Sequence, residues 1–259
     1  MHTSVAGGEI GLETHQGITT ISFSHPQRNS LPGGLLEALA NEIHSAGYDE
    51  ETKVIVLRSE GDATFCAGAS FDELAGITSL EQGIRFFSGF ARVINAMRKC
   101  PRLIIARVQG PCVGGGVGLV AAADYAIALE GAEVKLSELS IGIGPFVVGP
   151  AIERKIGHAA FSQLAIDSAL WRNADWARRK GLYAELHSNI EAVDESVRRL
   201  SSHLAHASPA AMVEMKKMFW KATEHWDELL HDRASISGKL ILTEQAKNAI
   251  RQFKQKKSL

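Results

Sequence analysis

The sequence has few cysteines and no long apolar run. Its three cysteines, Cys66, Cys100 and Cys112, form no Cys-x-x-Cys pair and are odd in number, which argues against a disulfide framework or a zinc site. No apolar run reaches the roughly 18 residues of a membrane-spanning helix, and the N-terminus lacks the basic and apolar regions of a secretory signal. We therefore expect a soluble protein of the reducing cytoplasm, without a membrane as partner.

An excess of charge of one sign is also lacking. The 28 Lys and Arg residues nearly balance the 29 Asp and Glu residues, so the net charge is -1 and gives no reason to expect a nucleic acid as partner. Any basic ligand-binding patch must be local. The ten histidines show no His-Glu-x-x-His spacing, so we expect no metal site.

Repeats, low-complexity tracts and proline-rich linkers are absent, and the first half of the chain alternates strand and helix patterns. The predicted strands cover residues 18–23, 54–57, 103–108, 125–129 and 133–136. The predicted helices between them cover residues 34–46, 80–97 and 119–123. Such alternation indicates an α/β core with covered sheet faces.

The end of the chain has a different pattern, because strand signals vanish after about Val147. Helical patterns there cover residues 152–156, 161–169, 193–205, 212–222 and 243–253. This helical part either caps the core or reaches a neighbouring subunit. We therefore divide the chain into a core domain over residues 1–195 and a C-terminal helical oligomerisation region over residues 196–259.

A glycine-rich segment, residues 110–118, joins a predicted strand to a predicted helix. Glycines let a ligand approach the backbone, and the free N–H groups of a helix N-terminus favour negative charge. A thioester carbonyl that becomes an enolate suits such a site, although a tight turn explains the glycines equally well. Phosphate-binding motifs do not fit, because Pro150-Ala151 replaces the Walker Lys-Ser/Thr pair and the segment is not Gly-x-Gly-x-x-Gly.

Two further stretches could carry chemistry. The small residues Ala67, Gly68 and Ala69 could expose a backbone N–H to a ligand. Glu138 has apolar neighbours, and desolvation there would disfavour its ionised form and suit it to general acid/base work. A salt bridge from Glu138 to Lys135 or Arg154 is the structural alternative.

In this order, the segments resemble the crotonase (enoyl-CoA hydratase/isomerase) family over essentially the whole chain. Residues 17–31 resemble its first strand and Pro-x-x-Asn-Ala-Leu turn, and residues 65–70 resemble its Phe-x-x-Gly-Ala-Asp loop, with Ser70 in place of Asp. Residues 109–116, 141–145 and 243–253 resemble its glycine segment, its Gly-Leu-x-Pro turn and its C-terminal helix. Over the whole chain, the sequence most resembles bacterial methylglutaconyl-CoA hydratase-like proteins.

The resemblance implies an α/β fold of repeated ββα units that form a spiral core, followed by a helical region. It implies an oxyanion hole made by the N–H groups of Ala69 and Gly115, and a proton exchanged by Glu138. It implies an acyl-CoA thioester as ligand, with coenzyme A as part of the substrate and no separate cofactor. The residues implied to bind this substrate are Ala67, Gly68, Phe71, Gly114, Gly118, Pro145, Phe253 and Lys256.

The family's assembly implies a homo-trimer or a homo-hexamer of two stacked trimers. In it, Phe253 and Lys256 would hold the nucleotide end of coenzyme A from a neighbouring subunit. Apolar positions on the helical tail exceed what a lone capping helix needs. They include Met215, Phe219, Trp226, Leu229 and Leu240.

One departure from the family concerns the chemistry. Typical hydratases of this family carry two glutamates, and Gly118 stands at the first position while Glu138 matches the second. We expect water addition to a 2-enoyl-CoA such as 3-methylglutaconyl-CoA, and a Gly118→Glu change that raises hydration. A Δ3,Δ2-enoyl-CoA isomerase that works with Glu138 alone is the first alternative, and a non-catalytic acyl-CoA-binding subunit is the second.

Overall fold

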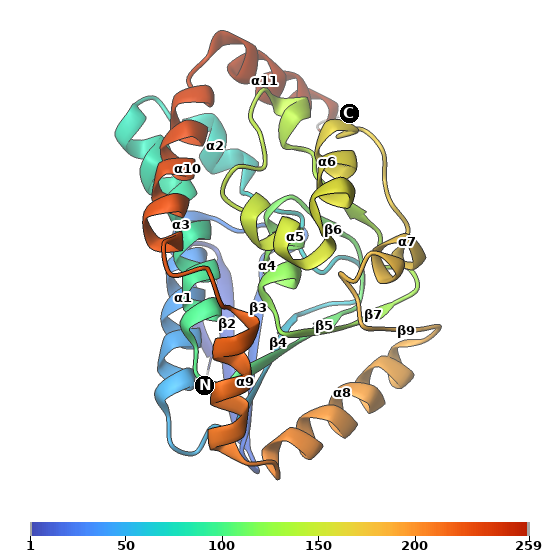
Figure 1. Cartoon of the computed structure of the whole chain (residues 1–259). Coiled ribbons are helices and arrows are strands. Elements are labelled where there is room, and N and C mark those ends of the chain that lie inside the picture. Colours follow the sequence, from blue (N-terminus) through green and yellow to red (C-terminus); the bar gives the residue numbers. More distant parts are fainter. Residues whose placement is uncertain (1, 258–259) are drawn as a thin grey trace.

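The computed structural model describes the backbone of residues 2–257 and the side chains of residues 3–254 (Figure 1). Its main sheet is mixed and has the strand order β1-β2-β3-β4-β5-β7-β9. These strands are β1 (His2–Val5), β2 (Gly8–His15), β3 (Ile18–Ser24), β4 (Val54–Ser59), β5 (Leu103–Val108), β7 (Tyr125–Leu129) and β9 (Glu185–His187). A second sheet pairs β6 (Cys112–Val113) with β8 (Val134–Lys135).

The parallel part of the main sheet positions the loops that matter below. Strands β1 to β3 are antiparallel, whereas β3, β4, β5, β7 and β9 run parallel to one another. Strand β5 is buried throughout and β4 nearly so, which fits apolar strands covered on both faces. Because β4 and β5 are parallel neighbours, the loops that follow them both leave the sheet at the C-terminal ends of the strands.

Helices cover both faces of the sheet. Val193 and Val197 of α8 (Ile190–Ala205) pack on one face, against residues of β4 and β5 such as Val56 and Ile105. On the other face the helices belong to the large apolar core, and Figure 1 shows α8 on the side of the sheet opposite α4. The helices are α1 (Gly33–Tyr48), α2 (Phe71–Gly76), α3 (Leu80–Lys99), α4 (Gly115–Ala122), the 3₁₀ helix η1 (Glu138–Ile141), α5 (Gly149–Ile156), α6 (His158–Ile166), α7 (Ala174–Arg179), α8 (Ile190–Ala205), α9 (Pro209–Phe219), α10 (Trp226–Leu240) and α11 (Glu244–Lys257).

The predicted α/β class is confirmed, with differences in detail. Strands β5 and β7 have the predicted bounds, and every predicted helix overlaps a helix of the structure. The expectation that strands end near Val147 is wrong, because β9 pairs with β7 at the sheet edge. The predicted boundary between residues 195 and 196 lies inside α8, and α8 packs on the sheet.

Two kinds of feature are absent from the described residues. None of the helices there is both long and apolar enough to cross a membrane. No group of three or more His, Cys, Asp or Glu side chains in that part of the chain is placed to hold a metal ion.

Candidate active site

The loops that follow β4 and β5 lie against each other at the C-terminal ends of these strands. The Val113 N–H donates to the Cys66 carbonyl at 2.9 Å. Gly68 has φ +84°, and a Cβ there would lie 2.8 Å from the Val113 carbonyl oxygen and 3.5 Å from the Gly115 nitrogen. A side chain at position 68 would therefore separate the loops, and glycine allows the close approach.

Ala69 and Gly115 each have a backbone N–H for which the structure shows no acceptor within residues 2–257. Leu31 donates to the Gly68 carbonyl at 2.8 Å and accepts from the Ser70 N–H at 3.2 Å, so the N–H of Ala69 points away from Leu31. Gly115 is the first residue of α4, where N–H groups have no partner inside the helix. Two free N–H groups from neighbouring loops can hold one anionic oxygen.

The Glu138 carboxyl lies beside the start of α4. A Cβ on Gly114 would lie 2.9 Å from Glu138 Oε1, and Gly114 has φ +51°, so glycine is required for both reasons. The Oε2 oxygen is buried and has no hydrogen-bond partner among the described residues. Burial raises the pKa of Glu138 to about 7, while its own backbone N–H acts in the opposite direction.

The alternative explanation of Glu138, a salt bridge, is not realised. The Lys135 ammonium lies over the Trp171 ring, 5.6 Å from its centroid, and the Arg154 guanidinium lies over the Trp220 ring at 5.3 Å. Both cations therefore face aromatic rings. No cation among the described residues pairs with Glu138, and such a buried carboxyl is suited to proton exchange near neutral pH.

These groups line an inner chamber of about 50 Å³. Glu138 is its only charged residue among the lining residues that the structure describes. Phe87 and Phe90 of α3 and Phe146 before α5 form much of its wall, and the Phe90 ring lies against Gly115. The predicted site residues that line it are Ala67, Gly68, Ala69, Phe71, Gly114, Gly115, Glu138 and Pro145.

Gly118 was predicted to bind substrate, but it is not among the residues that line the inner chamber. A Cβ at position 118 would lie 2.6 Å from Cγ1 and 2.8 Å from Cβ of Val148, which does line the chamber. Val148 thus occupies the space that a side chain at position 118 would need. Sequence reasoning missed Val148, because no local pattern connects it with Gly118.

An outer chamber of about 530 Å³ adjoins the inner one and shares Ala67, Ala69 and Phe71 with it. This volume falls within the range of ligand pockets. Phe253 of α11 lines it and stacks on Phe71, with ring centroids 4.1 Å apart. Lys254 of the same helix pairs with Asp72 at 2.7 Å.

Helix α11 covers the outer chamber of its own chain. It contacts both α2 and η1, and Figure 1 shows it across the end of the molecule where α2 also lies. The prediction that Phe253 serves a neighbouring subunit therefore has an alternative, since Phe253 lines the chamber of the chain that carries it. The side chain of Lys256, the other predicted residue of α11, lies outside the described residues.

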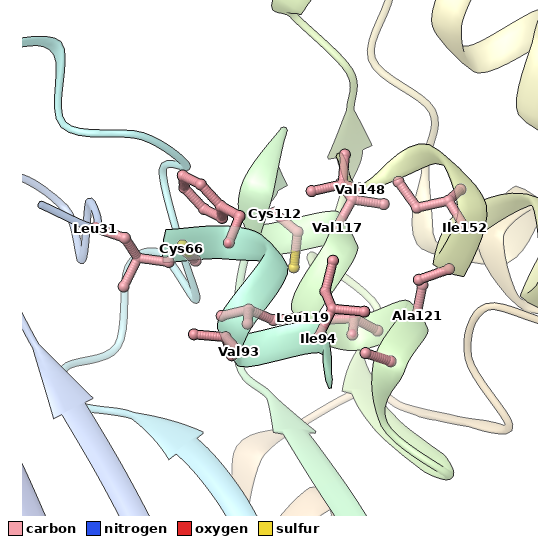
Figure 2. Close-up of a cluster of buried hydrophobic side chains, with 14 of the residues drawn as sticks. Leu31, Cys66, Val93, Ile94, Cys112, Val117, Leu119, Ala121, Val148 and Ile152 are labelled. Atoms are coloured by element: carbon pink, nitrogen blue, oxygen red, sulfur yellow. The ribbon is translucent and has the colours of Figure 1, made fainter. Parts of the chain in front are cut away.

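The cysteines support the loops by packing. Figure 2 shows Cys66, Cys112 and Val148 as members of one apolar cluster. Burial raises the pKa of the Cys66 thiol to about 12 and raises that of Cys112 further. Neither thiol can supply a thiolate near neutral pH.

Sequence comparisons identify relatives along most of the chain. The family model described as enoyl-CoA hydratase/isomerase matches residues 13–259. Mitochondrial methylglutaconyl-CoA hydratase of Rattus norvegicus is 31% identical over 205 residues, which are 77% of this chain and 64% of the rat protein. A probable enoyl-CoA hydratase of Bacillus subtilis (strain 168) is 26% identical over 250 residues, 96% of each chain. The chain thus spans less than two thirds of the rat relative's length.

Solved structures share the fold. The enoyl-CoA hydratase from Bacillus halodurans has a TM-score of 0.87 at 21% identity, over 94% of this chain and 99% of that one. An enoyl-CoA hydratase from Mycobacterium avium subsp. paratuberculosis K-10 has a TM-score of 0.83 at 23% identity, over 98% and 97%. At such identities the likeness extends to the fold alone.

Proposed function

Because the chain belongs to the enoyl-CoA hydratase/isomerase family, we propose that it is an enzyme that binds an acyl-CoA thioester and moves a proton on its acyl chain with Glu138. The observation that carries this proposal is the place of Glu138. Its unpaired carboxyl oxygen shares a small chamber with two loops whose N–H groups, at Ala69 and Gly115, are free.

In this proposal the two N–H groups bind the thioester carbonyl oxygen. Removal of a proton from the neighbouring carbon places negative charge on that oxygen, and the donors are already in position when the charge develops. Each such donor is worth about 2.7–4 kcal/mol in acyl-transfer enzymes. The N-terminal end of α4, which begins at Gly115, adds a favourable dipole.

Glu138 takes and returns the proton. A pKa of about 7 leaves both the ionised and the protonated form populated near neutral pH. One carboxyl suffices to remove a proton from C2 of a 3-enoyl-CoA and to deliver it to C4, which moves the double bond to C2. The geometry therefore favours a Δ3,Δ2-enoyl-CoA isomerisation, since Val148 fills the space of a second carboxylate.

Hydration of a 2-enoyl-CoA is the second candidate, and the names of the rat and Bacillus subtilis relatives favour it. Glu138 would then have to orient the water and also protonate the acyl chain. A 3-methylglutaconyl chain would bring a second carboxylate into a chamber whose described lining offers no cation. We therefore expect an uncharged acyl chain.

Turnover of three thioesters tests the proposal: crotonyl-CoA, 3-methylglutaconyl-CoA and 3-hexenoyl-CoA. We expect the fastest reaction to be isomerisation of 3-hexenoyl-CoA. Faster hydration of 3-methylglutaconyl-CoA would instead identify a hydratase with a carboxylated substrate. Tight binding of all three without turnover would identify a non-catalytic acyl-CoA-binding subunit.

A further inference from the structure

A buried serine lies in the wall of the outer chamber, beside the first of the two loops. Ser30 is 4% exposed and lines this chamber together with Ala67 and Ala69. Its neighbour Leu31 is paired with the backbone of Gly68 and Ser70. Ser30 therefore stands next to the segment that carries the free N–H of Ala69.

The hydrogen bonds of His25 determine the direction of this hydroxyl. Ser30 Oγ lies 3.1 Å from His25 Nδ1, and the backbone N–H of Gln27 donates to the same Nδ1 at 3.2 Å. Because a backbone N–H can only donate, Nδ1 must carry its lone pair, and the ring proton is on Nε2. The Ser30 O–H is therefore the donor to His25.

The Ser30 oxygen keeps its capacity to accept. Burial lowers the pKa of His25, with the charge of Asp72 acting in the opposite direction, so the ring is neutral at neutral pH. The structure shows no donor to Ser30 Oγ among the side chains and backbone groups of the described residues. Ser30, a residue of the chamber wall, thus has a buried acceptor that a ligand N–H would satisfy.

We propose that Ser30 Oγ accepts a hydrogen bond from the pantetheine amide N–H nearest the thioester of coenzyme A, an inference that rests on the proposed function. A carbonyl held by Ala69 and Gly115 fixes the start of the pantetheine arm. Only two methylene groups separate the sulfur from this amide nitrogen, so the amide must lie close to the loop of Ala69. Ser30 borders that loop. Ser30 is then a binding residue, and His25 is its positioning residue.

The hydroxyl can be removed without harm to the turn. Alanine is the usual residue at position 30 in the Pro-x-x-Asn-Ala-Leu turn that this segment resembles, so Ser30→Ala should fold. Ser140 provides a matched control, because it also lines the outer chamber but its hydroxyl bonds Ser168 Oγ at 2.8 Å.

The test compares two ligands that are not turned over: butyryl-pantetheine, and an analogue in which an ester oxygen replaces this one amide N–H. Calorimetric titration gives the dissociation constant of each. We expect the wild type to prefer the amide by about three- to tenfold, the value of one neutral hydrogen bond. In Ser30→Ala the preference should fall to nearly one, and in Ser140→Ala it should stay at the wild-type value.

Two outcomes would overturn the inference, and they differ in what they say of the proposed function. If the ligands bind but Ser30→Ala keeps the wild-type preference, Ser30 does not bind this amide, and the proposed function is unaffected. If the wild type binds neither pantetheine ligand nor butyryl-CoA, the inference and the proposed function fail together.

Discussion

Among single residues, Val148 occupies the space that a side chain at position 118 would need. A Cβ at position 118 would lie within 2.8 Å of both Cβ and Cγ1 of Val148. Because of this overlap, we no longer expect Gly118→Glu alone to raise hydration. Gly118→Glu should destabilise the fold by about 1–3 kcal/mol, as overpacking does, and should add no hydratase activity.

Removal of the Val148 side chain should relieve this overlap. Val148→Gly is needed rather than Val148→Ala, because the Cβ of Val148 is itself one of the overlapping atoms. Relative to Gly118→Glu, the double variant should regain stability towards urea and form more hydrated product per isomerised product. Val148→Gly alone is the control. Equal stability of Gly118→Glu and wild type would show that Val148 does not fill this space.

Glu138 should make the stability of the protein depend on pH. The native carboxyl has a pKa of about 7 and the ordinary value is 4.5, so the native state binds this proton more tightly than the unfolded chain does. The contribution to stability is complete below about pH 4.5 and is lost as the pH rises through about 7. Glu138→Gln should therefore gain stability relative to wild type between pH 5 and pH 8, on the order of 1–3 kcal/mol. Urea unfolding of both proteins at pH 5 and at pH 8 measures this change. A difference in unfolding free energy between Glu138→Gln and wild type that is the same at both pH values would contradict it.

At the scale of elements, the contact between α3 and α10 supports the wall of the inner chamber. A Cβ on Gly83 would lie 2.9 Å from Gly238 Cα, so the two helix backbones touch. Phe87 and Phe90 of α3 and Ser237 of α10 line the chamber next to this contact. The separation of the two helices therefore determines where these side chains stand.

Gly238→Val should push α3 and α10 apart. Since its Cβ would lie 2.9 Å from the Ile84 nitrogen, we expect a loss of about 1–3 kcal/mol in unfolding free energy, together with a higher KM for the thioester. Gly76→Ala is the control, because a Cβ there meets nothing within 4 Å. If the two variants unfold at the same urea concentration, the helices are not in this close contact.

The elements also show how far the sequence predicts the structure. Strands β5 and β7 were predicted because their buried apolar runs are unmistakable. Strand β9 was missed because Glu185–His187 is short, half-buried and partly polar, and it becomes a strand only through pairing with β7. Helix α10 was missed as a helix because its sequence is mostly polar and includes serine and glycine.

In the candidate site, too, some residues can be recognised from the sequence and others only from the folded structure. The local pattern indicates a glycine segment, a loop of small residues and an isolated glutamate, and the family resemblance implies the roles of Ala69, Gly115 and Glu138. The roles of Val148 and Ser30 depend on contacts with Gly118 and His25 that only the folded chain creates. The position of α11 over the outer chamber of its own chain depends on packing against α2 and η1, which the sequence pattern of α11 does not specify.

At the scale of the whole molecule, α9 carries apolar side chains that the single chain leaves exposed. Met215 is 44%, Met218 64% and Phe219 40% exposed. Not all of the apolar tail residues that the sequence suggested for a subunit contact are exposed, since Trp226 is buried and packs on Trp220. An exposed apolar patch of this kind is typical of a surface that contacts another protein.

A homo-trimer or homo-hexamer therefore stays our prediction, with α9 in the contact. Light scattering at micromolar concentration should give a mass of three or six chains. Met218→Glu should lower that mass, because a charge would be buried at the interface. The exposed Glu214, changed to Gln, is the control. A wild-type protein that stays monomeric would contradict this prediction.

The measurement that tests the central claim most directly is the kcat of Glu138→Gln, together with its affinity for a thioester. Glutamine keeps the shape of the side chain but cannot exchange a proton. With the thioester that the wild type turns over fastest, we expect kcat to fall by about 10²- to 10⁴-fold, while the dissociation constant of butyryl-CoA stays within about twofold of wild type, a difference of under 0.5 kcal/mol. A Glu138→Gln enzyme with full kcat would show that another group moves the proton, and the account of this site would be wrong.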